Sequence, residues 1–156
     1  MELHLREIVE DDHPFLYENE ADPIAIQMAA FTSRNMPDRE VYDARMQRIK
    51  DDPDAIMKAI VFEHQVIGCV GSYKLEGQRE MTYWISRSHW GKGIATAALR
   101  LHLNEIQERP VYATAAADNQ GSIRVLEKCG FKPCGRDTAF ANARNQEIEE
   151  LYFRLD

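Results

Sequence analysis

The chain has 156 residues, of which 44% are hydrophobic and 29% are charged, a composition typical of one globular domain over residues 1–156. Its net charge of −7 argues against a general nucleic-acid-binding protein. The sequence has no apolar run near the roughly 20 residues that span a bilayer, and it does not begin like a signal peptide. We therefore expect a cytoplasmic protein with no membrane partner, and reduced cysteines without metal-ligand spacing predict no metal site.

Strand and helix patterns follow one another along the whole chain. Apolar–polar alternation predicts a first strand at residues 3–8, and Asp11 and Asp12 then open a helix with Pro14 in its first turn. Residues 21–37 look irregular, and an amphipathic helix is predicted at 38–50. Further strands are predicted at residues 55–63, 65–75, 80–85, 111–116, 131–137 and 148–155, and further helices at 91–108 and 119–129. This order indicates a mixed α/β (α+β) fold.

The segment from Trp90 to Thr96, with the sequence WGKGIAT, is the most informative part of the chain. It follows a strand-like run that ends at Ile85, and it precedes a helical run. Glycines at such a junction leave backbone N–H groups free at a helix N-terminus, which favours a bound phosphate. The spacing does not match a P-loop, and a dinucleotide-binding fingerprint fails because Thr96 stands at its third position. A turn that only connects strand and helix is the alternative.

A second motif, NQGSIRVLEKCGF, begins at Asn119. It predicts a helix that Asn119 or Ser122 caps at its start and that ends at Gly130 in a left-handed conformation. Together the two segments resemble the GNAT superfamily of acyl-CoA-dependent N-acetyltransferases. The patterns W-G-x-G-x-A-T and N-x-x-S-x-R-V-L-E-K-x-G-F closely match the subgroup of ribosomal-protein N-terminal (alanine/serine) acetyltransferases. Trp90 stands where the wider family has Gln or Arg.

The resemblance implies a central, mostly antiparallel sheet of about seven strands, flanked by about four helices. Its fourth and fifth strands are expected to splay apart and admit the pantetheine arm of acetyl-CoA, the implied cosubstrate. The implied cofactor-binding residues are Ile85, Trp90, Gly91, Lys92, Gly93, Ile94, Ala95, Thr96, Asn119 and Ser122. In this scheme the loop backbone holds the pyrophosphate, and the Ile85 backbone bonds the pantetheine or polarises the thioester oxygen. Solvent exposure of Lys92, ordinary packing of Trp90 and helix capping by Asn119 and Ser122 are the structural alternatives.

Proton arithmetic indicates which catalytic groups matter. At pH 7 about one lysine amine in 2,500 is neutral, compared with about one α-amino group in ten. A base is therefore valuable, and the family often places such a carboxylate at the position of Glu80; the alternative is a solvated glutamate. A thiolate departs at pH 7 with a penalty of only about 2 kcal/mol, so an acid contributes less. The usual family tyrosine is replaced by Leu126, so either Ser122 acts as acid or donor, or no acid is used.

The leading hypothesis is direct acetyl transfer from acetyl-CoA to a primary amine, on a protein N-terminus or a small molecule. The alternative is a non-catalytic acyl-CoA-binding or sensing module on the same fold, because fold does not guarantee activity. Met28 and Phe31 lie where the family builds its acceptor site, although both could be core residues. The sequence leaves open whether the chain is a monomer or a homodimer.

Overall fold

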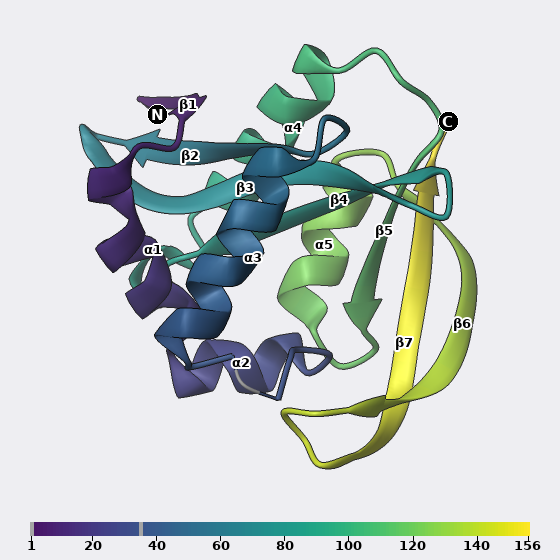
Figure 1. The fold of residues 1–156 in the computed structure, drawn as a ribbon. Coiled ribbons are helices and arrows are strands. Elements are labelled where there is room, and N and C mark those ends of the chain that lie inside the picture. The colour runs from purple at the N-terminus through teal and green to yellow at the C-terminus, as the bar shows by residue number, and fades with distance from the viewer. Residues whose placement is uncertain (1, 35) are drawn as a thin grey trace.

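The computed structural model describes residues 2–34 and 36–156 of the chain. Its centre is a seven-stranded sheet with the strand order β1-β2-β3-β4-β5-β7-β6 (Figure 1). The strands are β1 (Leu3–Glu7), β2 (Ile56–Phe62), β3 (Gln65–Leu75), β4 (Gln78–Ile85), β5 (Val111–Ala116), β6 (Lys132–Ala141) and β7 (Gln146–Leu155). The helices are α1 (His13–Glu20), α2 (Pro23–Ala29), α3 (Arg39–Asp51), α4 (Ile94–Glu105) and α5 (Gln120–Lys128), with short 3-10 turns η1 (Glu10–Asp12) and η2 (Arg87–His89). The mixed α/β fold expected from the sequence is confirmed.

Strands β4 and β5 form the one parallel pair among the strand pairs of the described sheet. They pair only at Arg79 with Val111 and at Glu80 with Tyr112. Both strands continue beyond these pairs, and there they separate. The expected splay of the fourth and fifth strands is confirmed, and its apex lies at Glu80.

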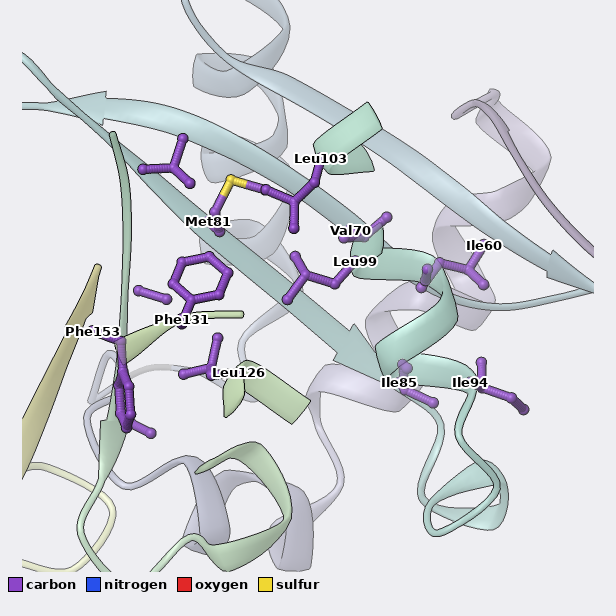
Figure 2. Packing of buried hydrophobic residues seen from close by; sticks show 14 of the residues in the cluster. Ile60, Val70, Met81, Ile85, Ile94, Leu99, Leu103, Leu126, Phe131 and Phe153 are labelled. Atoms are coloured by element: carbon purple, nitrogen blue, oxygen red, sulfur yellow. The ribbon is translucent and has the colours of Figure 1, made fainter. Parts of the chain in front are cut away.

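The two faces of the sheet carry separate apolar layers. Helices α4 and α5 cover one face, where Leu99 of α4 and Leu126 of α5 belong to the main core (Figure 2). On the other face, Leu16 of α1 and Tyr42 of α3 pack with Cys69 of β3. The splayed strands therefore have different helices on each side.

Side-chain direction in β4 follows from these layers. Tyr83 packs with the main core, and Trp84 packs with the α1–α3 layer. Because successive side chains of a strand point to opposite faces, Glu80 shares the face of Trp84. Glu80 and Tyr83 thus border the same opening from opposite sides of the sheet.

Two helical segments differ from the sequence predictions. Residues 21–37, expected to be irregular, contain α2, which Asp22 caps by accepting a hydrogen bond from Ile24 N at 3.1 Å. The helix expected at residues 91–108 spans only Ile94–Glu105. It starts late because Gly93 is left-handed, with φ of 77°, and it ends early because Ile106 is extended.

The last two strands are longer than predicted, since β6 reaches Ala141 and β7 begins at Gln146. Within the described ranges, no helix combines the length and the apolar character that crossing a membrane requires.

Candidate active site

The loop between β4 and α4 has the geometry of an anion-binding helix start. Gly91 and Gly93 are left-handed, with φ of 74° and 77°, and Gly93 is the N-cap of α4. Among the described residues no side chain caps this helix, so the N–H groups of its first turn face outward for a ligand. The buried side chains of Ile85 and Ile94 anchor the two ends of the loop in the main core (Figure 2).

The predicted loop residues offer different groups to a ligand. Trp90, Gly91, Lys92 and Gly93 are exposed, whereas Ile94 and Thr96 are buried and Ala95 is partly buried. The buried members can therefore contribute backbone N–H groups rather than side chains. The Trp90 ring nitrogen Nε1 donates to the Ile85 carbonyl oxygen at 2.9 Å. The ring thus ties the loop back to the end of β4.

The Ile85 backbone points into the opening between β4 and β5. Ser86 N donates to Ile67 O at 2.8 Å, which continues the β3–β4 ladder. Hydrogen bonds to one neighbour alternate along an antiparallel strand, so Ile85 directs its N–H and C=O away from β3. This direction is the one that the predicted contact with pantetheine or a thioester oxygen requires.

The start of α5 forms the other wall of the opening. Asn119 is the N-cap, and its Oδ1 accepts a hydrogen bond from Ser122 N at 3.2 Å. The capping role that the sequence left as an alternative for Asn119 is therefore present. The Ser122 Oγ is hydrogen-bonded to the hydroxyl of Tyr83 on β4, 2.8 Å away.

Tyr83 was not among the predicted site residues. Its only sequence signal is its position two residues before Ile85, which places both side chains on one face of the strand. Its contact with Ser122, 39 residues further along the chain, depends on where α5 packs against the sheet. The periodicity of the sequence does not predict where α5 packs.

Glu80 lies at the apex of the splay, as the third residue of β4. Burial raises the pKa of its carboxyl group, and the carboxylate of Glu150 on β7 raises it further. The pKa of Tyr73, its cross-strand neighbour on β3, is raised by burial and by both glutamates. A carboxylate whose pKa lies above its ordinary value is suited to take a proton near neutral pH.

Glu150 is a second residue that the sequence analysis missed. Burial raises the pKa of its carboxyl group too, against the effect of a hydrogen bond with Thr114. The sequence places Glu150 in the last strand, but its electrostatic contact with Glu80 depends on β7 lying beside β5. Strand β7 lies next to β5 although β6 comes between them in the sequence, and no local sequence pattern predicts this order.

Helix α2 borders a surface cleft of about 440 Å³ that also contacts the segment just after β5. The cleft is lined by Pro23, Ile24, Gln27, Met28, Asp118 and Arg144. Arg144 holds one side, because it donates to Gln27 O at 2.7 Å and pairs with Asp118 at 2.7 Å. On the β4 side, Arg87 pairs with Asp22 at 2.7 Å.

The two residues expected at an acceptor site differ in placement. Met28 lines the cleft, and its side chain is exposed. Phe31 instead packs with Ala30, Ala116 and Ala141 as a core residue. Across the described residues, no group of three or more His, Cys, Asp or Glu side chains is placed to hold a metal ion.

The site thus combines an anion-binding helix start, outward backbone groups on a splayed strand, a hydroxyl pair and a half-buried carboxylate. The first two can hold a phosphorylated, amide-containing arm between the strands. The hydroxyl pair can stabilise a leaving anion, and the carboxylate can take a proton. These are the requirements of acyl transfer from a nucleotide-linked thioester.

Comparisons with known proteins agree with this geometry. The sequence model of the acetyltransferase (GNAT) domain matches residues 2–132. The chain is 28% identical over 126 residues to a Bacillus subtilis protein named as a ribosomal N-acetyltransferase, YdaF, and the match covers 75% of this chain and 68% of that protein.

Two solved structures share the fold. The phosphinothricin acetyltransferase from Sinorhizobium meliloti, crystallised with acetyl-CoA, has a TM-score of 0.82 at 18% identity, over 99% of this chain and 88% of that one. The ribosomal-protein-alanine N-acetyltransferase from Brucella melitensis has a TM-score of 0.75 at 21% identity, over 97% and 98%. Since the domain match spans well over half of the sequence, the chain belongs to the GNAT family of acyl-CoA-dependent N-acetyltransferases.

Proposed function

We propose that this protein transfers the acetyl group of acetyl-CoA directly to a primary amine, with the α-amine of a protein N-terminus as the preferred acceptor. The observation that carries the proposal is Glu80, a half-buried carboxylate at the apex of the splay with a raised pKa. An α-amino group with a pKa near 8 needs far less help to lose its proton than a lysine amine near 10.4. A single half-buried glutamate as base therefore suits an α-amino acceptor better than a lysine amine.

The donor side of the proposal uses the β4–α4 loop and the start of α5. Backbone N–H groups from Gly91 to Thr96 hold the pyrophosphate, with the α4 dipole favouring its charge. The Ile85 N–H bonds the pantetheine or the thioester oxygen, and Asn119 and Ser122 contact the arm from the other wall. The outward direction of these groups in the structure supports this arrangement.

The acceptor side uses the opposite face of the sheet. The α2 cleft, with its exposed Ile24 and Met28, receives the residues that follow the amine. Glu80 takes the proton that the amine nitrogen gives up as it attacks the thioester carbonyl carbon. The C–S bond then breaks, and the electron pair leaves on sulfur beside Ser122.

The test is release of free CoA thiol from acetyl-CoA with a panel of amines. The panel holds short peptides with N-terminal Ala or Ser, the same peptides with a blocked N-terminus, free lysine and a polyamine. We expect release with the free peptides and none with the blocked ones, and mass spectrometry should place the acetyl group on the α-nitrogen. Faster thiol release with the polyamine than with the peptides would indicate that the acceptor is a small-molecule amine. No release with any amine, with acetyl-CoA still bound, would favour the acyl-CoA-binding module.

A further inference from the structure

A tyrosine–serine hydroxyl pair crosses the splay. The Tyr83 side chain leaves β4 beyond its last pair with β5, and its hydroxyl meets Ser122 Oγ in the first turn of α5 at 2.8 Å. Both side chains are partly buried, and the Tyr83 ring packs against the main core. The contact therefore joins two walls of the same opening.

This hydrogen bond constrains the hydroxyl of Ser122. The backbone of Ser122 is already held in place, because its N–H donates to Asn119 Oδ1 at 3.2 Å. A serine hydroxyl has one proton to donate and two lone pairs that accept. When Tyr83 donates to Ser122 Oγ, one lone pair is occupied and the serine proton must point to another acceptor. The tyrosine thereby sets which way the serine donates.

We propose that Tyr83 is a positioning residue for acetyl transfer, which turns the Ser122 hydroxyl proton toward the sulfur of CoA as the C–S bond breaks. The inference rests on the proposed function. The electron pair of the C–S bond goes to sulfur, and Ser122 donates a hydrogen bond to the thiolate without losing its proton. The amine proton goes to Glu80, and the thiolate takes a proton from water after the transfer.

Acidity decides between hydrogen bonding and proton transfer. A CoA thiol has a pKa near 8.5 and an ordinary tyrosine a pKa near 10, so passing the tyrosine proton to the thiolate is unfavourable by about 30-fold. Burial raises the pKa of Tyr83 above its ordinary value, which makes the transfer less favourable still. Tyr83 therefore keeps its proton and acts through the orientation of Ser122.

The experiment compares Tyr83→Phe, Ser122→Ala and the double variant. Tyr17→Phe is the matched control, because the Tyr17 hydroxyl also donates a hydrogen bond, to Pro37 O, on the α1 side of the molecule. We expect Tyr83→Phe to lower kcat by roughly 3- to 10-fold, the loss typical of one hydrogen bond, and Ser122→Ala to lower it by no more than about 30-fold. The double variant should match Ser122→Ala, KM for acetyl-CoA should change little, and Tyr17→Phe should retain kcat.

A second readout needs no acceptor. The thiol pKa of CoA bound to the protein is measured from the ultraviolet absorbance of its thiolate. We expect the wild type to lower this pKa by roughly half to one unit from about 8.5, and Tyr83→Phe and Ser122→Ala to remove the shift equally. A lowered thiol pKa in bound CoA, without turnover of any amine, would contradict the proposed function but would still support the role of Tyr83.

Three results would overturn the inference. One is an unshifted thiol pKa in wild-type protein that binds CoA. Another is a Tyr83→Phe loss that adds to Ser122→Ala in the double variant, because Tyr83 would then act independently of the serine. The third is a loss of kcat that follows the melting temperature in every variant, which would indicate a structural role only.

Discussion

At the scale of single residues, the proposed chemistry depends on two carboxylates, Glu80 and Glu150, that share one face of the sheet. Glu80 and Glu150 repel each other through a partly buried region, and this repulsion adds to the effect of burial on the pKa of Glu80. If Glu80 is the base, as proposed, it works only as a carboxylate, so we expect activity to fall as the pH drops through the pKa of Glu80. The raised pKa places that loss at a higher pH than an ordinary glutamate would.

Replacing Glu80 tests its role as the base. Glu80→Gln should lower kcat/KM by roughly 10²-fold, with partial recovery at high pH where the amine loses its proton unaided. Steady-state rates between pH 6 and 9.5, with a thermal melt to confirm folding, measure this. An unchanged pH–rate profile in the variant would transfer the role to water or to another residue.

Replacing Glu150 tests the electrostatic link between the two carboxylates. Glu150→Gln removes a like charge, so the pKa of Glu80 falls and the acidic limb of the pH–rate profile moves to lower pH. Glu149→Gln is the control, since this exposed neighbour points to the other face of β7 and pairs with Arg136 at 3.7 Å. If the acidic limb lies at the same pH in wild type and Glu150→Gln, Glu150 does not influence the pKa of the base.

At the scale of elements, the sequence predicted the parts whose signals are local. The glycines of the β4–α4 loop have positive φ, and the Asn119 cap and the strand before the loop lie close to where the pattern placed them. Helix α2 was not predicted because apolar residues such as Ile24 and Met28 also occupy its exposed face. The contrast between an apolar and a polar face, on which a helical period depends, is therefore missing. Its Asp–Pro start was a usable signal, since Asp22 caps the helix and Pro23 opens it.

Contacts between elements could not be read in the same way. The Tyr83–Ser122 bond joins β4 to α5, and the Glu80–Glu150 interaction joins β4 to β7. Each contact depends on strand order and helix packing, and the periodicity of apolar residues within one element does not predict either of these. The two residues that the sequence analysis missed are therefore the ones whose partners lie far along the chain.

The β4–α4 loop supports a prediction about binding of the cosubstrate. Gly93→Glu should abolish acetyl-CoA binding in calorimetry, because a carboxylate at the helix start repels the pyrophosphate and a side chain strains a left-handed position. Gly93→Ala isolates the strain. Gly77→Glu is the matched control, because Gly77 has a φ of 81° in the β3–β4 turn and open space around it. Equal affinity for wild type and Gly93→Glu would remove this loop from the binding site.

At the scale of the whole molecule, the two parts of the sheet, β1–β4 and β5–β7, share only two backbone pairs. Arg79, buried at this apex, reinforces the junction. It donates to Ser72 Oγ and Asp54 O, both at 2.9 Å, and to Glu108 at 3.0 Å. Ser72 Oγ in turn meets His102 Nε2 of α4 at 2.9 Å, so the network links β3, β4 and α4.

Removing this arginine should destabilise the whole fold. Arg79→Met removes the donor of three hydrogen bonds, one of them to the buried Ser72 Oγ, and we expect the free energy of unfolding to fall by roughly 1–3 kcal/mol. Arg154→Met is the control, because Arg154 forms an exposed pair with Asp156 at 2.6 Å, and its loss should leave the free energy of unfolding nearly unchanged. Denaturant unfolding measures both, and similar losses in the two variants would contradict the junction role.

Under the proposed function, the early separation of β4 from β5 also links the stability of the protein to the concentration of acetyl-CoA. Past Glu80, the edge of β4 that faces β5 has no neighbouring strand, and acetyl-CoA seated there would supply the contacts that a strand supplies elsewhere. By mass action, a ligand at one hundred times its Kd adds about 2.7 kcal/mol to the free energy of unfolding. The melting temperature should therefore climb with acetyl-CoA concentration, and resistance to unfolding in a cell would rise and fall with the supply of activated acetyl groups.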